Sequence, residues 1–108
     1  MGHERVLSIT PDHPSLAGHF PGHPVVPGVV LLDEVLDLLR QSLPGPLVVT
    51  GLPLVKFMSP LKPGEIVTIR VDEETSTRAT FSCRAEARLV ASGAIEFTHG
   101  STTRAKPV

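Results

Sequence analysis

The residue types best suited to chemistry are a histidine and an aspartate that stand on either side of a Pro-Gly pair. His19 lies in residues 11–28, a segment with five prolines and three glycines. Each proline fixes its own φ and restrains the residue before it, so this loop is predicted to be stiff. Asp33 follows His19 by fourteen positions. An imidazole can accept a proton near neutral pH and a carboxyl group can donate one, which favours general acid–base catalysis.

A helix is predicted to begin between these two residues. From Val29 to about Leu43 the apolar residues fall on one broad face, and Asp33 lies on the polar stripe opposite. The backbone N–H groups of Gly28 and Val29 would then be unpaired donors at the positive end of the helix. Such donors stabilise negative charge on a carbonyl oxygen as it forms. The segment therefore has the parts needed to remove a proton beside a thioester carbonyl and to expel a hydroxide as water.

The rest of the chain is predicted to form strands. The loop of residues 11–28 cannot be a helix, and Pro60–Gly64 is predicted to be a turn. A bulge is expected at Ser92-Gly93. The tail from about residue 100 is expected to fray. The expected strands are Arg5–Thr10, Leu47–Val55 leading into Lys56-Phe57, a run around Val67–Val71, an alternating run from Ala79 to Arg88, and Leu89–Thr98. One long helix with antiparallel strands predicts an α+β architecture in which the helix packs on the sheet.

Composition limits the classes of protein that the chain can belong to. A length of 108 residues with 41% hydrophobic residues fits a single folded domain, residues 1–108. The net charge of −1 and the absence of a basic run argue against nucleic-acid binding. The longest uncharged apolar stretch, Pro24–Leu32, is too short to span a membrane, and the first ten residues do not read as a signal peptide. We therefore expect a cytoplasmic protein, and the small core favours oligomerisation.

Cysteine and the other histidines suggest no metal or redox chemistry. The single cysteine, Cys83, alternates with apolar neighbours in a strand, so it is predicted to be a small core residue and not a nucleophile. His13 and His23 could join His19 around a metal ion, but only Asp12 stands near to complete such a site. No metal is expected.

The run from His19 to Asp33, HFPGHPVVPGVVLLD, resembles the signature of the β-hydroxyacyl-[acyl-carrier-protein] dehydratases of the hydroxydecanoyl and hydroxymyristoyl type. Their pattern is His-Phe-x-Gly-x-Pro-x-x-Pro-Gly, with an acidic residue fourteen positions after the histidine. The segment Lys56–Glu65 also resembles the downstream block of this family. The resemblance implies a short member with the hotdog fold, an antiparallel sheet wrapped around one long central helix.

The resemblance also implies a role for each residue of the motif. His19 would remove the α-proton, and Asp33 would protonate the departing 3-hydroxyl group. The Gly28 N–H would bind the thioester carbonyl, and the Val25 carbonyl would hold one nitrogen of His19 and so fix its tautomer. Two further positions, Phe20 and Val29, would contact the substrate.

The partners and cofactors implied by the resemblance follow from the same chemistry. The substrate would arrive on the phosphopantetheine of acyl carrier protein, and the enzyme would need no cofactor of its own. The active site would form at the interface of a homodimer, with the histidine and the acid from different subunits. A higher homo-oligomer, or assembly with a partner dehydratase or ketosynthase subunit, is a further option.

Two positions depart from the family pattern. Asp37 stands where many members have glutamine. Its carboxylate could raise the pKa of Asp33, or Arg40 could instead neutralise Asp37. The sequence leaves these alternatives open. Met58-Ser59 replaces adjacent basic residues of some members, so docking of the acidic carrier protein would depend on other cations: Lys56, Lys62, Arg84 or Arg88.

The predicted function is the dehydration of a (3R)-3-hydroxyacyl-carrier thioester to the trans-2-enoyl thioester, in fatty-acid or related polyene or polyketide synthesis. One alternative is a hotdog acyl thioesterase, which would need a carboxylate to activate water but would not need His19. The other alternative, from a different class, is a non-catalytic acyl-binding subunit.

Overall fold

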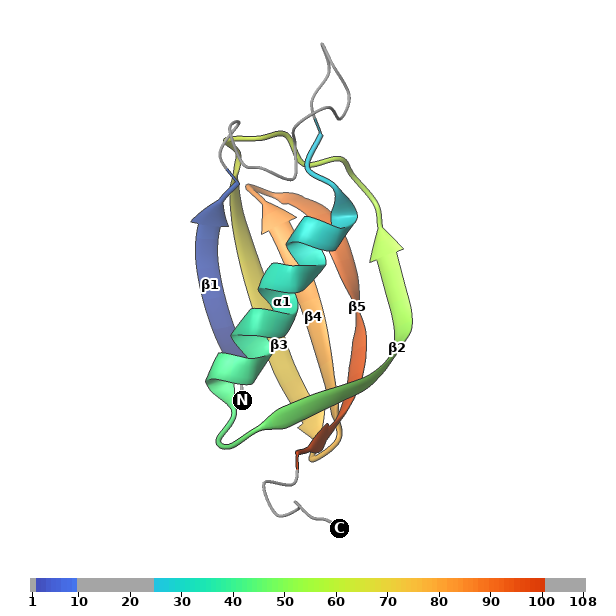
Figure 1. Cartoon of the computed structure of the whole chain (residues 1–108). Helices are drawn as coiled ribbons and strands as arrows, with labels where there is room; N and C mark the ends of the chain where they lie inside the picture. The colour runs from blue at the N-terminus through green and yellow to red at the C-terminus, as the bar shows by residue number, and fades with distance from the viewer. Residues whose placement is uncertain (1, 10–24, 101–108) are drawn as a thin grey trace.

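One helix lies across one face of a five-stranded antiparallel sheet (Figure 1). The computed structural model describes residues 2–9 and 25–100. The sheet order is β1-β3-β4-β5-β2, so β1 and β2 form its two edges. The elements, in chain order, are β1 (Gly2–Ser8), α1 (Gly28–Ser42), β2 (Leu47–Phe57), β3 (Ile66–Thr75), β4 (Arg78–Ala85) and β5 (Arg88–His99). The predicted α+β architecture, an antiparallel sheet with one long helix packed on it, is confirmed.

The helix forms where the apolar periodicity predicted it, and its apolar side is buried. Val35 and Leu39 have no exposed surface, and Leu31 is 3% exposed. Residues four apart lie on the same side of a helix, so Leu31, Val35 and Leu39 form one row directed at the sheet. After the helix, Gly45 adopts a φ of 73° between two prolines, which neither continue a helix nor allow one before them. No helix within the described residues is long and apolar enough to cross a membrane.

The sheet supplies the other half of the core through alternate residues of its central strands. Val67, Ile69 and Val71 of β3 are fully buried, and Ala79, Phe81, Cys83 and Ala85 of β4 follow the same period of two. Burial raises the pKa of the Cys83 thiol to about 12. The complete burial of Cys83 confirms the prediction that it is a core residue, and a thiol with a raised pKa carries little of the nucleophilic thiolate at neutral pH.

Three strand predictions need correction. The alternation expected to run to Arg88 in one strand ends at Ala85, because the chain turns at Glu86, where φ is 58°. The bulge expected at Ser92-Gly93 is also wrong, since both residues pair in register and the extra residue of β5 is Val90. The first strand is Gly2–Ser8, earlier than the predicted Arg5–Thr10. The proline-rich loop, apart from residues 25–28, and the tail beyond residue 100 lie outside the described residues.

A cluster of charged and polar groups fixes the turn that precedes β3, and the predicted turn at Pro60–Gly64 is confirmed. Arg88 donates two hydrogen bonds to the Glu65 carboxylate, at 2.8 and 3.1 Å. The Lys62 N–H donates to the same carboxylate at 2.8 Å. The hydrogen bonds from Arg88 and then from Lys62 lower the pKa of Glu65 from 4.5 to about 2.

The low pKa of Glu65 predicts a pH dependence of stability. A carboxylate whose pKa falls on folding stabilises the folded state above its unfolded pKa, and this stabilisation is lost as the pH falls through the folded value. We expect Glu65→Gln to lose stability less steeply than the wild type between about pH 4.5 and pH 2. Denaturant unfolding at several pH values measures this difference. Parallel curves for the two proteins across this range would contradict the assignment.

A second prediction concerns Gly93, which is buried between β2 and β4. A Cβ atom at this position would collide with the Leu54 carbonyl oxygen and lie 2.7 Å from the Phe81 ring. The backbone oxygen cannot move without disturbing the pairing of β2 with β5. We expect Gly93→Ala to lower the free energy of unfolding by about 1–3 kcal/mol, as overpacking of a core does.

The matched control for this prediction is Gly51→Ala, on the strand that pairs with β5. A Cβ atom there would lie 3.2 Å from the exposed, flexible Glu96 carboxylate, which can move away. We expect a change within about 0.5 kcal/mol, as for an ordinary surface substitution. Urea unfolding measures both free energies of unfolding. Equal losses for the two substitutions would show that the contact with the Leu54 carbonyl oxygen does not cause the destabilisation.

Candidate active site

The start of α1 has backbone donors without helical partners. Pro27 precedes the helix in an extended conformation, with φ −60° and ψ 140°, and no side chain caps the helix start. The first turn contains no acidic residue, and among the described residues the one backbone bond to its N–H groups is that of Val30 with the Pro27 carbonyl, at 3.0 Å. The N–H groups of Gly28 and Val29 therefore point out of the helix without an acceptor in the described part of the chain, as the sequence predicted.

The position of this helix start is fixed by the segment after β2. The N–H of Val26 donates to the Leu61 carbonyl at 2.8 Å, and Val26 is 6% exposed. The same segment is fixed to β5, because the Met58 N–H donates to the Val90 carbonyl at 2.8 Å. Two backbone bonds thus connect the helix start to β5 through the residues that follow Phe57.

A mostly apolar pocket of about 550 Å³ lies at this junction. One wall is Val25–Val29 and the other is Phe57–Leu61, while Leu31 and Val90 also line the space. Apolar pockets with a few directed polar groups are typical of sites for small molecules and acyl groups. The polar groups here include the N–H donors of the helix start, so the pocket can hold a carbonyl group with an apolar chain attached.

Glycine at the helix start allows an aromatic ring to lie against the backbone. A Cβ atom at Gly28 would lie 2.7 Å from the Phe57 ring. The Phe57 side chain is 55% exposed although it is large and apolar. A substrate group that enters beside Gly28 would therefore contact the Phe57 ring as well as the N–H donors.

The structure brings together three of the six predicted site residues. Val25, Gly28 and Val29 all line the pocket. Asp33 lies on the same helix but is exposed and does not line this pocket. His19 and Phe20 lie outside the described residues, so their positions relative to the pocket stay a prediction.

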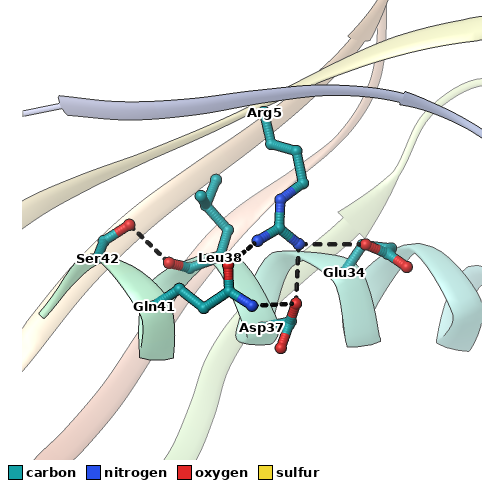
Figure 2. A network of polar contacts seen from close by, with 6 residues as sticks. All are labelled: Arg5, Glu34, Asp37, Leu38, Gln41 and Ser42. Carbon is teal, nitrogen blue, oxygen red and sulfur yellow. Dashed lines mark hydrogen bonds and ion pairs between the residues drawn. The ribbon is translucent and has the colours of Figure 1, made fainter.

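The question left open at Asp37 has an answer that the sequence did not suggest. Figure 2 shows Arg5 of β1 between Glu34, Asp37 and Gln41 of α1. Arg5 Nη1 lies 2.9 Å from Asp37 Oδ2 and 3.3 Å from Glu34 Oε1, and Arg5 Nη2 donates to the Gln41 side chain at 2.6 Å. Arg5, and not Arg40, therefore supplies the positive charge beside Asp37. These contacts connect the edge strand β1 to the polar side of the helix.

One of the four cations predicted to dock a carrier protein is already engaged. All three guanidinium nitrogens of Arg88 donate to atoms of the segment Ser59–Glu65. Arg88 is therefore already engaged within its own chain, and a docking role for any of the four cations stays a prediction. Lys56, Lys62 and Arg84 are exposed.

Metal binding has no support in the described part of the chain. Across residues 2–9 and 25–100, no three side chains of His, Cys, Asp and Glu gather as a metal site would require. His13, His19 and His23, for which the sequence predicts no metal, lie outside these ranges.

Sequence reasoning did not assign the wall of the pocket that follows β2. Phe57 and Met58 are large apolar residues that are about half exposed, directly before Ser59-Pro60. Two exposed apolar residues at the end of a strand were the available signal, since such residues often mark a binding surface. Leu61 and Val90 gave no comparable signal, because buried apolar residues are ordinary in a core.

Comparison with protein families agrees with the motif. The model of the ApeI-like family, described as ApeI dehydratase, matches residues 3–94. The 3-hydroxyacyl-[acyl-carrier-protein] dehydratase FabZ of Streptococcus equi subsp. zooepidemicus is 33% identical over 106 residues, covering 88% of this chain and 76% of that protein. FabZ of Streptococcus uberis is also 33% identical, and the shares are 91% and 86%.

Solved structures give the same result at the level of the fold. The dehydratase heterocomplex ApeI:P from Xenorhabdus doucetiae contains a chain that superimposes with a TM-score of 0.82 at 25% identity, covering 91% of this chain and 88% of that chain. The fluoroacetyl-CoA-specific thioesterase FlK superimposes with a TM-score of 0.68 at 14% identity, which shows a shared fold alone. The chain is an enzyme of the dehydratase class with the hotdog fold, and it belongs to the ApeI-like dehydratase family.

Proposed function

We propose that this protein removes water from a (3R)-3-hydroxyacyl thioester carried on acyl carrier protein and yields the trans-2-enoyl thioester. The observation that carries the proposal is the apolar pocket at an uncapped helix start in a chain of the dehydratase family. The pathway would be fatty-acid synthesis or the related synthesis of a polyene or polyketide. FabZ relatives at 33% identity, named as 3-hydroxyacyl-[acyl-carrier-protein] dehydratases, support the choice of substrate class.

The chemistry assigns each proton and bond to a group of this chain. His19 takes the α-proton, and the negative charge that develops on the thioester oxygen is stabilised by the N–H groups of Gly28 and Val29. The bond from C3 to its hydroxyl oxygen breaks, and Asp33 supplies the proton with which that oxygen leaves as water. The Val25 carbonyl orients the His19 imidazole. The reaction needs only acid–base groups and oxyanion donors, so no cofactor is proposed.

A homodimer is proposed because one edge of the sheet is apolar and has no neighbouring strand in the described part of the chain. β2 pairs with β5 on one side only. Its outward residues Val48, Leu54 and Phe57 are 46–55% exposed. Open strands of this kind pair readily with a second chain. Asp33 is also exposed, so a second subunit could bring a histidine to it.

The heterocomplex of the Xenorhabdus relative raises a second assembly. That protein is described as a dehydratase heterocomplex, ApeI:P. A partner dehydratase could cover the β2 edge in the same way as a second copy, and a ketosynthase subunit is a further option. Size-exclusion chromatography with light scattering measures the molar mass of the purified chain. It distinguishes a homodimer from a monomer that needs a different subunit as its partner.

The first functional prediction concerns the two acid–base residues. We expect His19→Ala and Asp33→Asn each to lower turnover at least about a hundredfold, as the loss of a general acid or base does. The rate is measured by the absorbance of the enoyl thioester formed from a 3-hydroxyacyl carrier protein. A near-normal rate in either variant would remove that residue from the mechanism. Thioester hydrolysis that survives His19→Ala would instead favour the thioesterase alternative.

The second functional prediction tests whether the site is shared between subunits. When His19→Ala and Asp33→Asn proteins exchange subunits, half of the dimers are hybrids and each hybrid has one intact site. We expect recovery to about a quarter of wild-type activity. The matched control mixes His19→Ala with the double variant, which produces no intact site. Absence of recovery after proven subunit exchange would contradict the shared site.

A further inference from the structure

The Arg88 side chain joins the start of β5 to three points of the segment Ser59–Glu65. Nε donates to Ser59 Oγ at 2.7 Å, and Nη1 donates to Glu65 Oε2 at 3.1 Å. Nη2 donates to Glu65 Oε1 at 2.8 Å and to the Pro60 carbonyl at 2.9 Å. Every nitrogen of this guanidinium group is therefore used within one short segment of the same chain.

That segment is a wall of the pocket. Ser59, Pro60 and Leu61 line the pocket, and the Leu61 carbonyl accepts the hydrogen bond from the Val26 N–H. Val26 is separated from Gly28 only by Pro27, whose φ is restricted by its ring. A continuous set of contacts thus runs from Arg88, through Pro60-Leu61 and Val26, to the N–H donors of the helix start.

We infer that Arg88 is a positioning residue for dehydration, which holds the Ser59–Leu61 wall and through it the donors at the start of α1. The inference rests on the proposed function. Arg88 touches neither the reacting atoms nor the carrier protein in this account. Its effect is geometric, since donors that stabilise a developing charge lose much of their effect when they are displaced by about 1 Å.

The ion pair of Arg88 with Glu65 is suited to hold the Ser59–Leu61 wall in one position. Arg88 and Glu65 form a fork-to-fork pair, which fixes direction as well as distance. Hydrogen bonds from Arg88 and then from Lys62 hold the pKa of Glu65 at about 2, so the carboxylate stays ionised at neutral pH. A lysine has one nitrogen and cannot reach Ser59, Pro60 and Glu65 in the three directions that the planar guanidinium serves.

Arg70 provides a matched control on the same sheet. Its guanidinium donates three hydrogen bonds to the carboxylates of Asp72 and Glu4, at 2.9–3.0 Å. It lies on β3 and does not line the pocket. Arg70→Gln thus removes the same side chain and comparable ion pairs without touching the contacts that lead to the helix start.

The kinetic test compares Arg88→Gln, Arg88→Lys and Arg70→Gln on two substrates, a 3-hydroxyacyl carrier protein and the corresponding 3-hydroxyacyl pantetheine thioester. We expect Arg88→Gln to lower kcat about tenfold on both substrates with little change in KM. Arg88→Lys should recover part of kcat, and Arg70→Gln should match the wild type. A rise in KM for the carrier protein alone, with normal turnover of the pantetheine thioester, would overturn the inference and make Arg88 a docking residue.

Hydrogen exchange at the Val26 amide tests the geometry without any substrate. We expect Arg88→Gln and Glu65→Gln to exchange this amide faster than the wild type, because the Leu61 carbonyl is less firmly held. Arg70→Gln should leave the exchange rate unchanged. Equal protection of Val26 in folded Glu65→Gln and wild-type protein would overturn the inference. A wild-type protein that leaves both substrates intact would defeat the proposed function, while the exchange result would still decide whether the Arg88 pair positions Val26.

Discussion

Burial of one side of α1 against the sheet is the interaction on which the other features of the molecule depend. Val35 and Leu39 are fully enclosed in the core between the helix and the sheet, together with the inward residues of β3 and β4. Because this burial fixes the helix axis, it also fixes where the helix begins. The start has no side-chain cap, its residues Gly28 and Val29 line the pocket, and the Val26–Leu61 hydrogen bond sets their place beside the wall that follows β2.

Most of the fold could be predicted from local patterns, and the failures have local causes. The helix was predictable because a strong 3.6-residue period lies between Pro27-Gly28 and Pro44-Gly45. The end of β4 was not, because apolar and polar residues keep alternating through a turn that Glu86 makes with a positive φ. Gly93 suggested a bulge, whereas its small size serves the close approach of the Leu54 carbonyl from the neighbouring strand.

The candidate site was predictable only where neighbours in sequence form it. Gly28 and Val29 follow directly from the position of the helix start, and they line the pocket. The opposite wall depends on contacts between distant segments, such as that of Arg88 with Glu65, 23 positions away, and no periodicity encodes such pairs. The partner of Asp37 could not be predicted for the same reason, since Arg5 reaches it from a strand 32 positions earlier. A cation three or four positions away on the same helix is the partner that a sequence suggests. Here the packing of β1 beside α1 determines which cation lies next to Asp37.

We propose that the pocket at the helix start holds an acyl thioester while one molecule of water is removed from it. The most direct measurement is the intact mass of a 3-hydroxyacyl carrier protein after incubation with the purified chain. We expect a carrier protein that has lost the mass of one water and retains its acyl group. Release of the whole acyl group, or a carrier protein of unchanged mass, would contradict it.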